Sequence, residues 1–380
     1  MKKRHIVFIS MPYTSHLPAA LPIISVLVRR GHLVTCAISE QFSQKVIHAG
    51  ARYLPIPALD SSGTKDRLRN LARRTLTDTA ALFEEERPDL IIYDLANMAG
   101  RILAHRWGVP AIQISPNFAF SKEFLAVQFE NPAAQAGALR FSEDADDFLR
   151  DCGVPSSGYL FNRERLNIYL FPTDLDPVGR AADESCVYAG RCAGEQPYLG
   201  DWRPPARDGL PTVLIITSTT YILGSDYFRV CIEALSGMPF NVVLFPGDDS
   251  KLAELQPLPK NFQHVKGTSA VKALASATLL ICTGGATTVS EAMYHGVPLV
   301  MTSKDIELEE LCERWARLGL GIHLKQEEVN AESLRKAVTE VTTSQQILRR
   351  VRLMQRTVQH EPGGEEVANR VEEFMERHCV

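Results

Sequence analysis

Hydrophobic and polar positions alternate along this chain in a pattern that predicts strands and helices in turn. An apolar run at residues 5–10 is followed by helical spacing over 17–30 and by a second apolar run at 32–37. A strand, a helix and a strand in this order form a βαβ unit, in which the strands are parallel. The order continues with a helical stretch near 67–86, a strand at 90–93, a helix at 98–107 and a strand at 111–115. Residues 1–192 are therefore expected to form a doubly wound domain.

The alternation is interrupted before it begins again. Residues 116–176 mix polar and aromatic positions without a clear period until 166–171, so we expect variable loops and short helices there. Residues 193–210 contain several prolines and glycines and few apolar residues to bury. This composition predicts a linker between two domains.

A second doubly wound domain is predicted over residues 211–361. The expected strands lie at 212–217, 241–245, 279–282 and 299–302, and the expected helices at 227–235, 270–276 and 287–295. A long polar helical region over 332–356 and a final helix at 366–377 follow. This layout would allow the tail, residues 362–380, to pack back on the first domain. The expected fold class is α/β, with two Rossmann-like domains facing across a cleft.

Composition agrees with a two-domain globular protein. The chain has 380 residues, of which 45% are hydrophobic, enough for more than one core. Its net charge is −4 with dispersed Lys and Arg, so we expect neither nucleic-acid nor anionic-membrane binding. The first apolar run is too short for a signal peptide, and no run reaches the ~18 residues of a membrane span. We expect a soluble cytoplasmic protein whose eight cysteines, which form no CxxC pair, are reduced.

Two side chains in the first domain are candidates for proton transfer. His16 lies between the first strand and the first helix, and Asp94 follows the strand at 90–93. Both should face the crevice at the carboxyl edge of the sheet. An imidazole can accept a proton from a hydroxyl at neutral pH, and a carboxylate on its other nitrogen would fix its tautomer. The residues alone also allow a capping or surface role for His16 and a helix N-cap role for Asp94.

A glycine pair in the second domain is a candidate anion site. Gly284 and Gly285 lie between a strand and a helix, where the backbone can approach a ligand and free N–H groups face it. Thr287 and Thr288 add hydroxyl donors. A diphosphate could be held there without a metal, whereas plain helix capping is the alternative reading.

The stretch 283–300, TGGATTVSEAMYHGVPLV, resembles the donor-binding signature of the macrolide and UDP-glucuronosyl type (family 1) glycosyltransferases. Further markers follow the family's order: Ser15-His16, Arg30-Gly31-His32, Pro88 to Asp94, and Leu318-Gly-Leu-Gly321. The resemblance covers nearly the whole chain except 116–205. It implies the GT-B fold and a metal-independent, inverting transfer of a sugar from a nucleotide diphosphate donor to a hydroxyl group.

The resemblance also implies roles for individual residues. His16 matches the base that deprotonates the acceptor, and Asp94 matches the acid that orients this base. Glu291 matches the ribose-binding carboxylate, and Glu307 matches the acid that binds sugar hydroxyls. The complete implied donor site consists of Thr220, Thr283, Gly284, Gly285, Thr287, Thr288, Glu291 and Glu307.

Several donor-side positions depart from the family's pattern. Thr283 replaces a phosphate-binding histidine, Thr287 replaces an asparagine, and Leu308 replaces a glutamine. The other departures are Thr219 in place of a glycine, and Gly267, Ser269 and Ala270 in place of the Trp, Pro and Gln or His around the base. The donor motif is therefore degenerate. Either the site still binds a nucleotide sugar, or the fold serves another reaction of His16 and Asp94 or a non-catalytic partner protein.

The expected substrates are a dTDP- or UDP-linked sugar and a hydrophobic small molecule such as a polyketide or another secondary metabolite. Four phenylalanines could line an apolar acceptor pocket, or could equally be ordinary core: Phe118, Phe120, Phe124 and Phe129. No cofactor and no metal are expected, because the DxD triplets at 144–146 and 174–176 do not follow a nucleotide-binding strand. No membrane insertion is expected, and homodimerisation is left open.

Overall fold

The computed structural model describes residues 2–13, 15–58, 67–80, 83, 87–117, 132–176, 184–190, 209–217, 223–265, 270–303 and 306–379. Thr219, Thr220, Gly267, Ser269, the four phenylalanines of the expected acceptor pocket and most of the predicted linker lie outside these ranges. The Glu307 side chain also lies outside the description, although its helix does not. Two compact units are present: unit 1 is Met1–Tyr198 with Glu361–Val380, and unit 2 is Leu199–His360.

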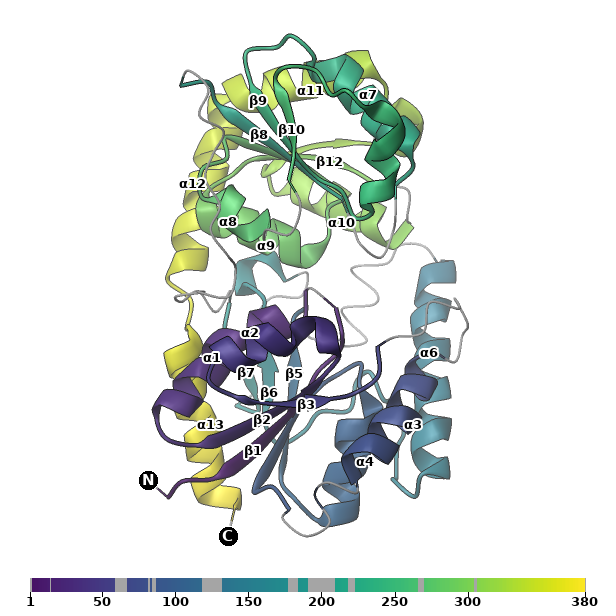
Figure 1. Cartoon of the computed structure of the whole chain (residues 1–380), viewed down its shortest axis with the longest axis vertical. Helices are drawn as coiled ribbons and strands as arrows, with labels where there is room; N and C mark the ends of the chain where they lie inside the picture. The colour runs from purple at the N-terminus through teal and green to yellow at the C-terminus, as the bar shows by residue number, and fades with distance from the viewer. Residues whose placement is uncertain are drawn as a thin grey trace. The chain divides into compact units, whose positions relative to one another are not determined.

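Unit 1 is built on a parallel seven-stranded sheet in the order β3-β2-β1-β4-β5-β6-β7 (Figure 1). Its strands are β1 (His5–Ile9), β2 (Leu33–Ile38), β3 (Arg52–Pro55), β4 (Leu90–Asp94), β5 (Ala111–Ser115), β6 (Asn167–Tyr169) and β7 (Cys186–Tyr188). Its helices are α1 (Leu17–Arg29), α2 (Ser43–His48), α3 (Arg67–Ala80), α4 (Met98–Trp107), α6 (Pro132–Asp151) and α13 (Gly364–His378), with 3₁₀ turns η1 (Glu40–Phe42) and η3 (Thr173–Leu175).

Helices cover both faces of this sheet. Figure 1 shows α1 and α13 packed together on one face, and α3, α4 and α6 on the other. The core below α3 and α4 includes Ile91 and Tyr93 of β4. Because successive strand residues point to opposite faces, Asp94 points to the face on which α1 begins.

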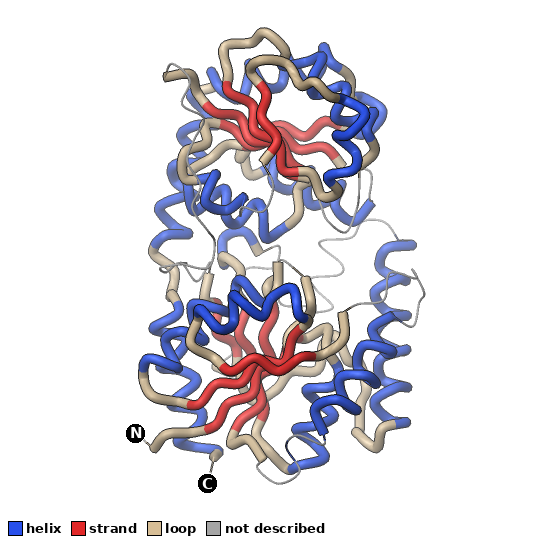
Figure 2. Tube along the Cα trace, viewed as in Figure 1, coloured by secondary structure: helices blue, strands red, loops and turns tan. Residues whose placement is uncertain are grey.

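Unit 2 repeats this architecture with a parallel six-stranded sheet in the order β10-β9-β8-β11-β12-β13 (Figure 2). Its strands are β8 (Thr212–Ile216), β9 (Asn241–Phe245), β10 (Phe262–His264), β11 (Leu279–Cys282), β12 (Leu299–Thr302) and β13 (Gly321–Leu324). Its helices are α7 (Ser225–Leu235), α8 (Ala270–Leu274), α9 (Ala286–His295), α10 (Ile306–Arg317), α11 (Ala331–Thr343) and α12 (Gln345–Gln359), with 3₁₀ turns η5 (Asp249–Leu255) and η6 (Gln326–Glu328).

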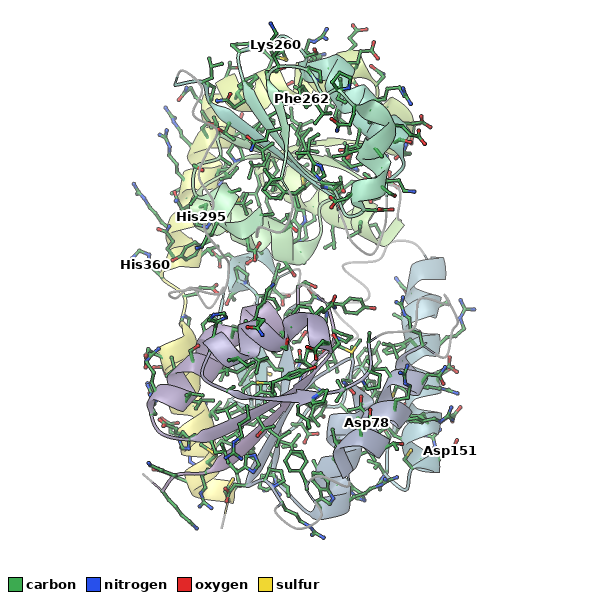
Figure 3. The ribbon with its side chains drawn as sticks, in the orientation of Figure 1. Asp78, Asp151, Lys260, Phe262, His295 and His360 are labelled. Carbon is green, nitrogen blue, oxygen red and sulfur yellow. The ribbon has the colours of Figure 1, made fainter. Side chains whose placement is uncertain are left out.

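The two faces of the second sheet are covered by different helices. Helices α7 and α11 pack together on one face, whereas α9 packs against α12 and α8 on the other. Phe262 of β10 is buried among the side chains of the α7 and α11 core, while Lys260 just before it is exposed (Figure 3). The predicted doubly wound fold is confirmed in both units.

Both sheets have a topological switch point beside their first strand. In unit 1 the chain runs outward from β1 to β3 in one direction and from β4 to β7 in the other, so the switch lies between β1 and β4. In unit 2 it lies between β8 and β11 for the same reason. Open α/β sheets bind ligands outside the carboxyl ends of the strands at this point.

The structure corrects one of the sequence-based expectations and divides another predicted segment into two elements. The 116–176 segment contains the 20-residue helix α6 rather than only loops and short helices. Its apolar positions Phe141, Ala145, Phe148 and Leu149 recur at helical spacing and pack into the unit 1 core. The helical region expected at 332–356 is confirmed and is divided into two helices, because Ser344 ends α11 and caps α12 by accepting a hydrogen bond from the Ile347 amide at its hydroxyl.

The C-terminal tail belongs to unit 1. Helix α13 packs against α1, and its buried Glu372 accepts hydrogen bonds from Arg30 Nη1 at 2.5 Å and His32 Nε2 at 3.1 Å. Arg4, directly before β1, donates to the Cys379 carbonyl at 2.7 Å. None of the described helices is long and apolar enough to cross a membrane.

Candidate active site

His16 and Asp94 meet at the switch point of unit 1. His16 immediately precedes α1, and Asp94 is the last residue of β4. His16 Nδ1 lies 2.6 Å from Asp94 Oδ2, and the two side chains are 13% and 4% exposed. Since an ionised carboxylate can only accept, the short contact places the proton on Nδ1 and leaves Nε2 as the imidazole's acceptor. Neutral His16 therefore carries its lone pair on the atom that points away from Asp94.

The second oxygen of Asp94 is also fixed. The Ala96 amide donates to Oδ1 at 2.9 Å, while the Asp94 carbonyl accepts from the Asn97 amide at 2.8 Å. Each carboxylate oxygen thus has one defined partner, and the carboxylate plane cannot rotate without losing both. This arrangement holds the imidazole in one tautomer and one orientation.

The structure excludes the helix-capping roles that the sequence left open for these two residues. Helix α4 is capped by Asn97, whose side chain accepts from the Ala99 amide, so Asp94 is not the N-cap. His16 occupies the N-cap position of α1 but makes no side-chain capping bond. The His16 and Asp94 side chains therefore contact each other, and neither caps a helix.

Two further contacts position the loop that carries Asp94. Asn97 donates from its side-chain amide to the Ser10 carbonyl at 3.2 Å, which joins the loops after β4 and β1. The hydroxyl of buried Tyr159 donates to the Leu95 carbonyl, directly after Asp94. Asn97 and Tyr159 are positioning residues that the sequence analysis missed, because Asn97 lies three residues beyond β4 and Tyr159 lies in a segment without a regular period.

Tyr13 lies beside the histidine. Its ring centroid is 5.3 Å from that of His16. Burial raises the pKa of the Tyr13 hydroxyl, while the positive charge of Arg67 lowers it and the negative charge of Asp94 raises it further. Tyr13 therefore stays protonated near neutral pH and lies within electrostatic reach of both Arg67 and Asp94.

The glycine pair of unit 2 forms the turn between β11 and α9, at the second switch point. Gly284 adopts φ +78°, a left-handed conformation that favours glycine, and an added Cβ would overlap Cys312 Sγ. Trp315 Nε1 donates to the Gly284 carbonyl at 3.0 Å, and the Cys312 thiol donates to the Thr283 carbonyl at 3.6 Å. Burial raises the pKa of the Cys312 thiol well above its usual value, so it remains a neutral donor.

The backbone amides at the start of α9 point away from the body of the helix. The first helical bond runs from the Val289 amide to the Gly285 carbonyl at 3.0 Å, so the amides before Val289 have no intrahelical acceptor. Thr287, Thr288 and Glu291 are half-buried on this first part of the helix, and Thr283 is buried just before it. The free amides and the positive helix end make this turn suited to bind an anion.

The predicted site residues thus fall into two groups. Unit 1 brings together His16 and Asp94, and unit 2 brings together the sequence-predicted residues Thr283, Gly284, Gly285, Thr287, Thr288 and Glu291 around one turn. Cys312 and Trp315, which hold this turn from α10, were not foreseen, because a residue about 30 positions away leaves no local pattern.

One DxD triplet has a structural use. Asp146 accepts from the Ser156 hydroxyl and from the Gly158 amide, both at 2.6 Å. Its carboxylate therefore organises the turn after α6. Within the described residues, no group of three or more His, Cys, Asp or Glu side chains is placed to hold a metal ion.

Comparison with known proteins agrees with this geometry. Residues 231–374 match the family described as Erythromycin biosynthesis protein CIII-like, C-terminal domain. The chain is 29% identical to the NDP-glycosyltransferase YjiC of Bacillus subtilis over 398 residues, covering 100% of both chains. It is 26% identical to the oleandomycin glycosyltransferase of Streptomyces antibioticus, over 98% of this chain and 92% of that protein.

The fold is shared with solved glycosyltransferases. The calicheamicin glycosyltransferase CalG4 superposes with a TM-score of 0.80 at 27% identity and covers 100% of both chains. Sequence and structural similarity therefore extend over both units and include the strands and turns that carry the two groups of site residues. Residues 231–374 therefore match the EryCIII-like C-terminal domain, and the chain resembles glycosyltransferases of natural products over its whole length, with the GT-B fold that the solved structures share.

Proposed function

We propose that this enzyme transfers a sugar from a dTDP- or UDP-linked donor to a hydroxyl group of a hydrophobic small molecule, with inversion at the anomeric carbon. The observation that carries this proposal is the 2.6 Å contact between His16 Nδ1 and Asp94 Oδ2 at the switch point of unit 1. It supports a base that is oriented, buried on one side and open at Nε2.

In the proposed reaction His16 acts as a general base. Nε2 takes the proton of the acceptor hydroxyl as its oxygen attacks the anomeric carbon, and Asp94 stabilises the imidazolium that forms. The new carbon–oxygen bond forms as the bond to the diphosphate breaks, and its electron pair leaves on the phosphate oxygen. A single displacement from the face opposite the leaving group inverts the anomeric configuration.

The α9 turn is the proposed site of the diphosphate. The amides that precede Val289 and the positive end of the helix would stabilise the charge that develops on the leaving group. The Thr283, Thr287 and Thr288 hydroxyls would add donors, and Glu291 would bind the ribose. The glycosyltransferase VinC, which has the same fold with a TM-score of 0.71 at 17% identity, is solved in complex with dTDP. This supports thymidine diphosphate as the first nucleotide to test.

The acceptor class is proposed from the relatives. One of them is named for oleandomycin and a structural neighbour for calicheamicin, and both names denote natural products. Acceptor binding by Phe118, Phe120, Phe124 and Phe129 remains a proposal, because these residues lie outside the described ranges.

Titration calorimetry with dTDP, UDP and GDP, each with magnesium and with EDTA, tests the donor part. We expect micromolar binding of dTDP or UDP that EDTA does not weaken, because the helix end rather than a metal neutralises the phosphates. Incubating the enzyme with an α-linked donor and a panel of hydroxylated aromatic and polyketide acceptors, followed by NMR of the product, tests the transfer. A β-linked product supports the mechanism. An α-linked product excludes single displacement, and absence of nucleotide binding would favour a repurposed fold or a non-catalytic partner.

A further inference from the structure

A cavity of about 250 Å³ lies in unit 1 beside α3, lined by Ala58, Arg67, Asn70, Leu71, Arg73 and Arg74. Three of its six lining side chains are arginines. Arg67, Asn70, Leu71 and Arg74 recur at helical spacing, so they lie on one face of α3, with Arg67 and Arg74 two turns or ~10 Å apart. The cavity is therefore a small pocket with positive charge at both ends.

The charge in this cavity is not balanced by the described parts of the protein. No described carboxylate lies within 4.0 Å of the Arg67, Arg73 or Arg74 guanidinium groups, although Arg69 on the same helix pairs with Asp144 at 3.4 Å. Asp78, the acid within α3 (Figure 3), follows Arg74 by one turn in the sequence, but the two described side chains form no ion pair. Arg73 is held with its guanidinium carbon 5.3 Å from the centre of the Phe148 ring.

One arginine of the cavity acts electrostatically on a neighbour of the proton-transfer pair. Arg67, which lines it, is close enough to Tyr13 to affect the electrostatics of the Tyr13 hydroxyl, as is Asp94. Tyr13 in turn lies against the His16 ring, with 5.3 Å between ring centroids. Tyr13 therefore lies against the His16 ring and within the electrostatic influence of one of the cavity's arginines.

We propose that this cavity binds a carboxylate or similar anionic group carried by the acceptor, and so selects acidic acceptors whose hydroxyl then reaches His16. The inference rests on the proposed function and names the acceptor's chemical class. An arginine matches a carboxylate in a bidentate geometry, and three guanidinium groups without described counter-ions favour an anion over a neutral group. At about 250 Å³ the cavity is smaller than the ~300–1,000 Å³ of a site for a whole drug-sized ligand. It suits one polar end of an acceptor.

Equilibrium binding of two matched ligands tests this without a donor: 6-hydroxy-2-naphthoate and its neutral amide, 6-hydroxy-2-naphthamide. We expect the wild-type enzyme to bind the acid about 5- to 30-fold more tightly than the amide, as measured by ligand-observed NMR or calorimetry. R67Q/R74Q should bind both ligands equally. The control R52Q/R106Q removes the same number of charges from unit 1 at two exposed positions outside the cavity. It should keep the preference for the acid over the amide.

Three results would overturn the inference: equal binding of both ligands to the wild-type enzyme, a preference that survives in R67Q/R74Q, or the same loss in R52Q/R106Q. Inorganic phosphate distinguishes an acceptor-borne anion from a free one. If phosphate displaces the naphthoate at equal concentration, the cavity is a general oxyanion site and the acceptor claim is wrong.

The same variants separate this inference from the proposed reaction. If an acidic acceptor is glycosylated, R67Q/R74Q should raise its KM about 5- to 30-fold at nearly unchanged kcat, because the lost contact acts on ground state and transition state alike. Enzyme that binds the naphthoate as expected but transfers no sugar would leave the cavity's assignment intact and contradict the proposed function alone.

Discussion

Replacing Asp94 by Asn would leave the side chain's shape almost unchanged but should reverse the tautomer of His16. The Ala96 amide donates to Oδ1 at 2.9 Å, so the carboxamide oxygen of the variant must take that position. Its NH2 group then faces His16 Nδ1, which in the wild type lies 2.6 Å from Oδ2. Because Nδ1 must now accept, the proton moves to Nε2, and the imidazole can no longer take a proton from the acceptor.

The size of the loss follows from the same contacts. Turning the carboxamide over would restore the working tautomer but set NH2 against the Ala96 amide, and leaving a buried donor unsatisfied costs about 1–3 kcal/mol. The carboxylate's charge-assisted hydrogen bond to the developing imidazolium contributes about 1.5–3 kcal/mol more. A barrier increase of about 3–6 kcal/mol corresponds to a ~10²–10⁴-fold decrease in kcat.

Steady-state transfer kinetics of Asp94→Asn, with Asp94→Ala as the comparator, test this reasoning. We expect Asn to be no better than Ala, although it preserves the volume and the Ala96 contact, because Ala leaves the tautomer free. The dTDP affinity should be unchanged in both. Near wild-type kcat in Asp94→Asn with a large loss in Asp94→Ala would refute the argument, since it would mean that Asp94 acts through packing rather than through its charge.

Three further changes probe the structures around the two sites. Gly284→Ala should weaken dTDP binding and lower the thermal stability, because the φ of +78° costs about 1–2 kcal/mol and the overlap with the Cys312 sulfur about 1–3 kcal/mol. Adding Cys312→Ala should remove the loss that is due to the overlap with the sulfur, and calorimetry and thermal unfolding would measure this recovery. Glu372→Ala should lower the free energy of unfolding in denaturant by about 2–4 kcal/mol, because it leaves buried His32 without its carboxylate and removes one of the two carboxylates that pair with Arg30. Glu376→Ala, at an exposed position of the same helix, should change it by less than about 0.5 kcal/mol. Burial acts to raise the pKa of Asp89, but hydrogen bonds from the His5 amide and the Arg4 guanidinium lower it overall. The Asp89 carboxylate therefore stabilises the folded state above its unfolded pKa of about 3.9, and this stabilisation is lost as the pH falls further. Asp89→Asn should therefore be less stable at pH 7 by about 0.5–1 kcal/mol and match the wild type near pH 2, as unfolding at both pH values would measure.

Each of these predictions has an outcome that contradicts it. Equal losses in Gly284→Ala with and without Cys312→Ala would mean that the sulfur does not constrain the turn. Equal unfolding of the Glu372 and Glu376 variants would mean that the buried carboxylate does not anchor α13. A difference for Asp89→Asn that persists at low pH would mean that its contribution is not due to ionisation.

Much of the fold could be predicted because strand and helix periods are local properties of the sequence. The apolar runs of the sequence form β1, β2 and β4, which are short, buried strands. Because these strands are parallel, their carboxyl ends lie at one edge of the sheet. That rule also predicted that His16 and Asp94 would lie close together. The edge strands β3 and β10 were missed, because three or four residues are too few to establish a period.

The supporting contacts could not be predicted in the same way. Trp315 and Cys312 reach the Gly284 turn from α10, and Tyr159 reaches the Asp94 loop from a segment in which the sequence shows no regular period. Such contacts depend on tertiary packing between segments about 30 to 60 residues apart. Helix α6 was not predicted for a related reason, because its apolar face can be identified only from the core residues that it contacts.

The most direct test of the central claim is the transfer rate of His16→Ala, measured with dTDP affinity in the same preparation and with His48→Ala as the matched control. His48 is an exposed histidine of unit 1, and among the described residues its ring bonds only to a backbone carbonyl of its own helix, at 2.7 Å. We predict that kcat of His16→Ala falls about 10²–10⁴-fold while the dTDP affinity stays within twofold and His48→Ala remains fully active. Transfer by His16→Ala at the wild-type rate would contradict the assignment of His16 as the base.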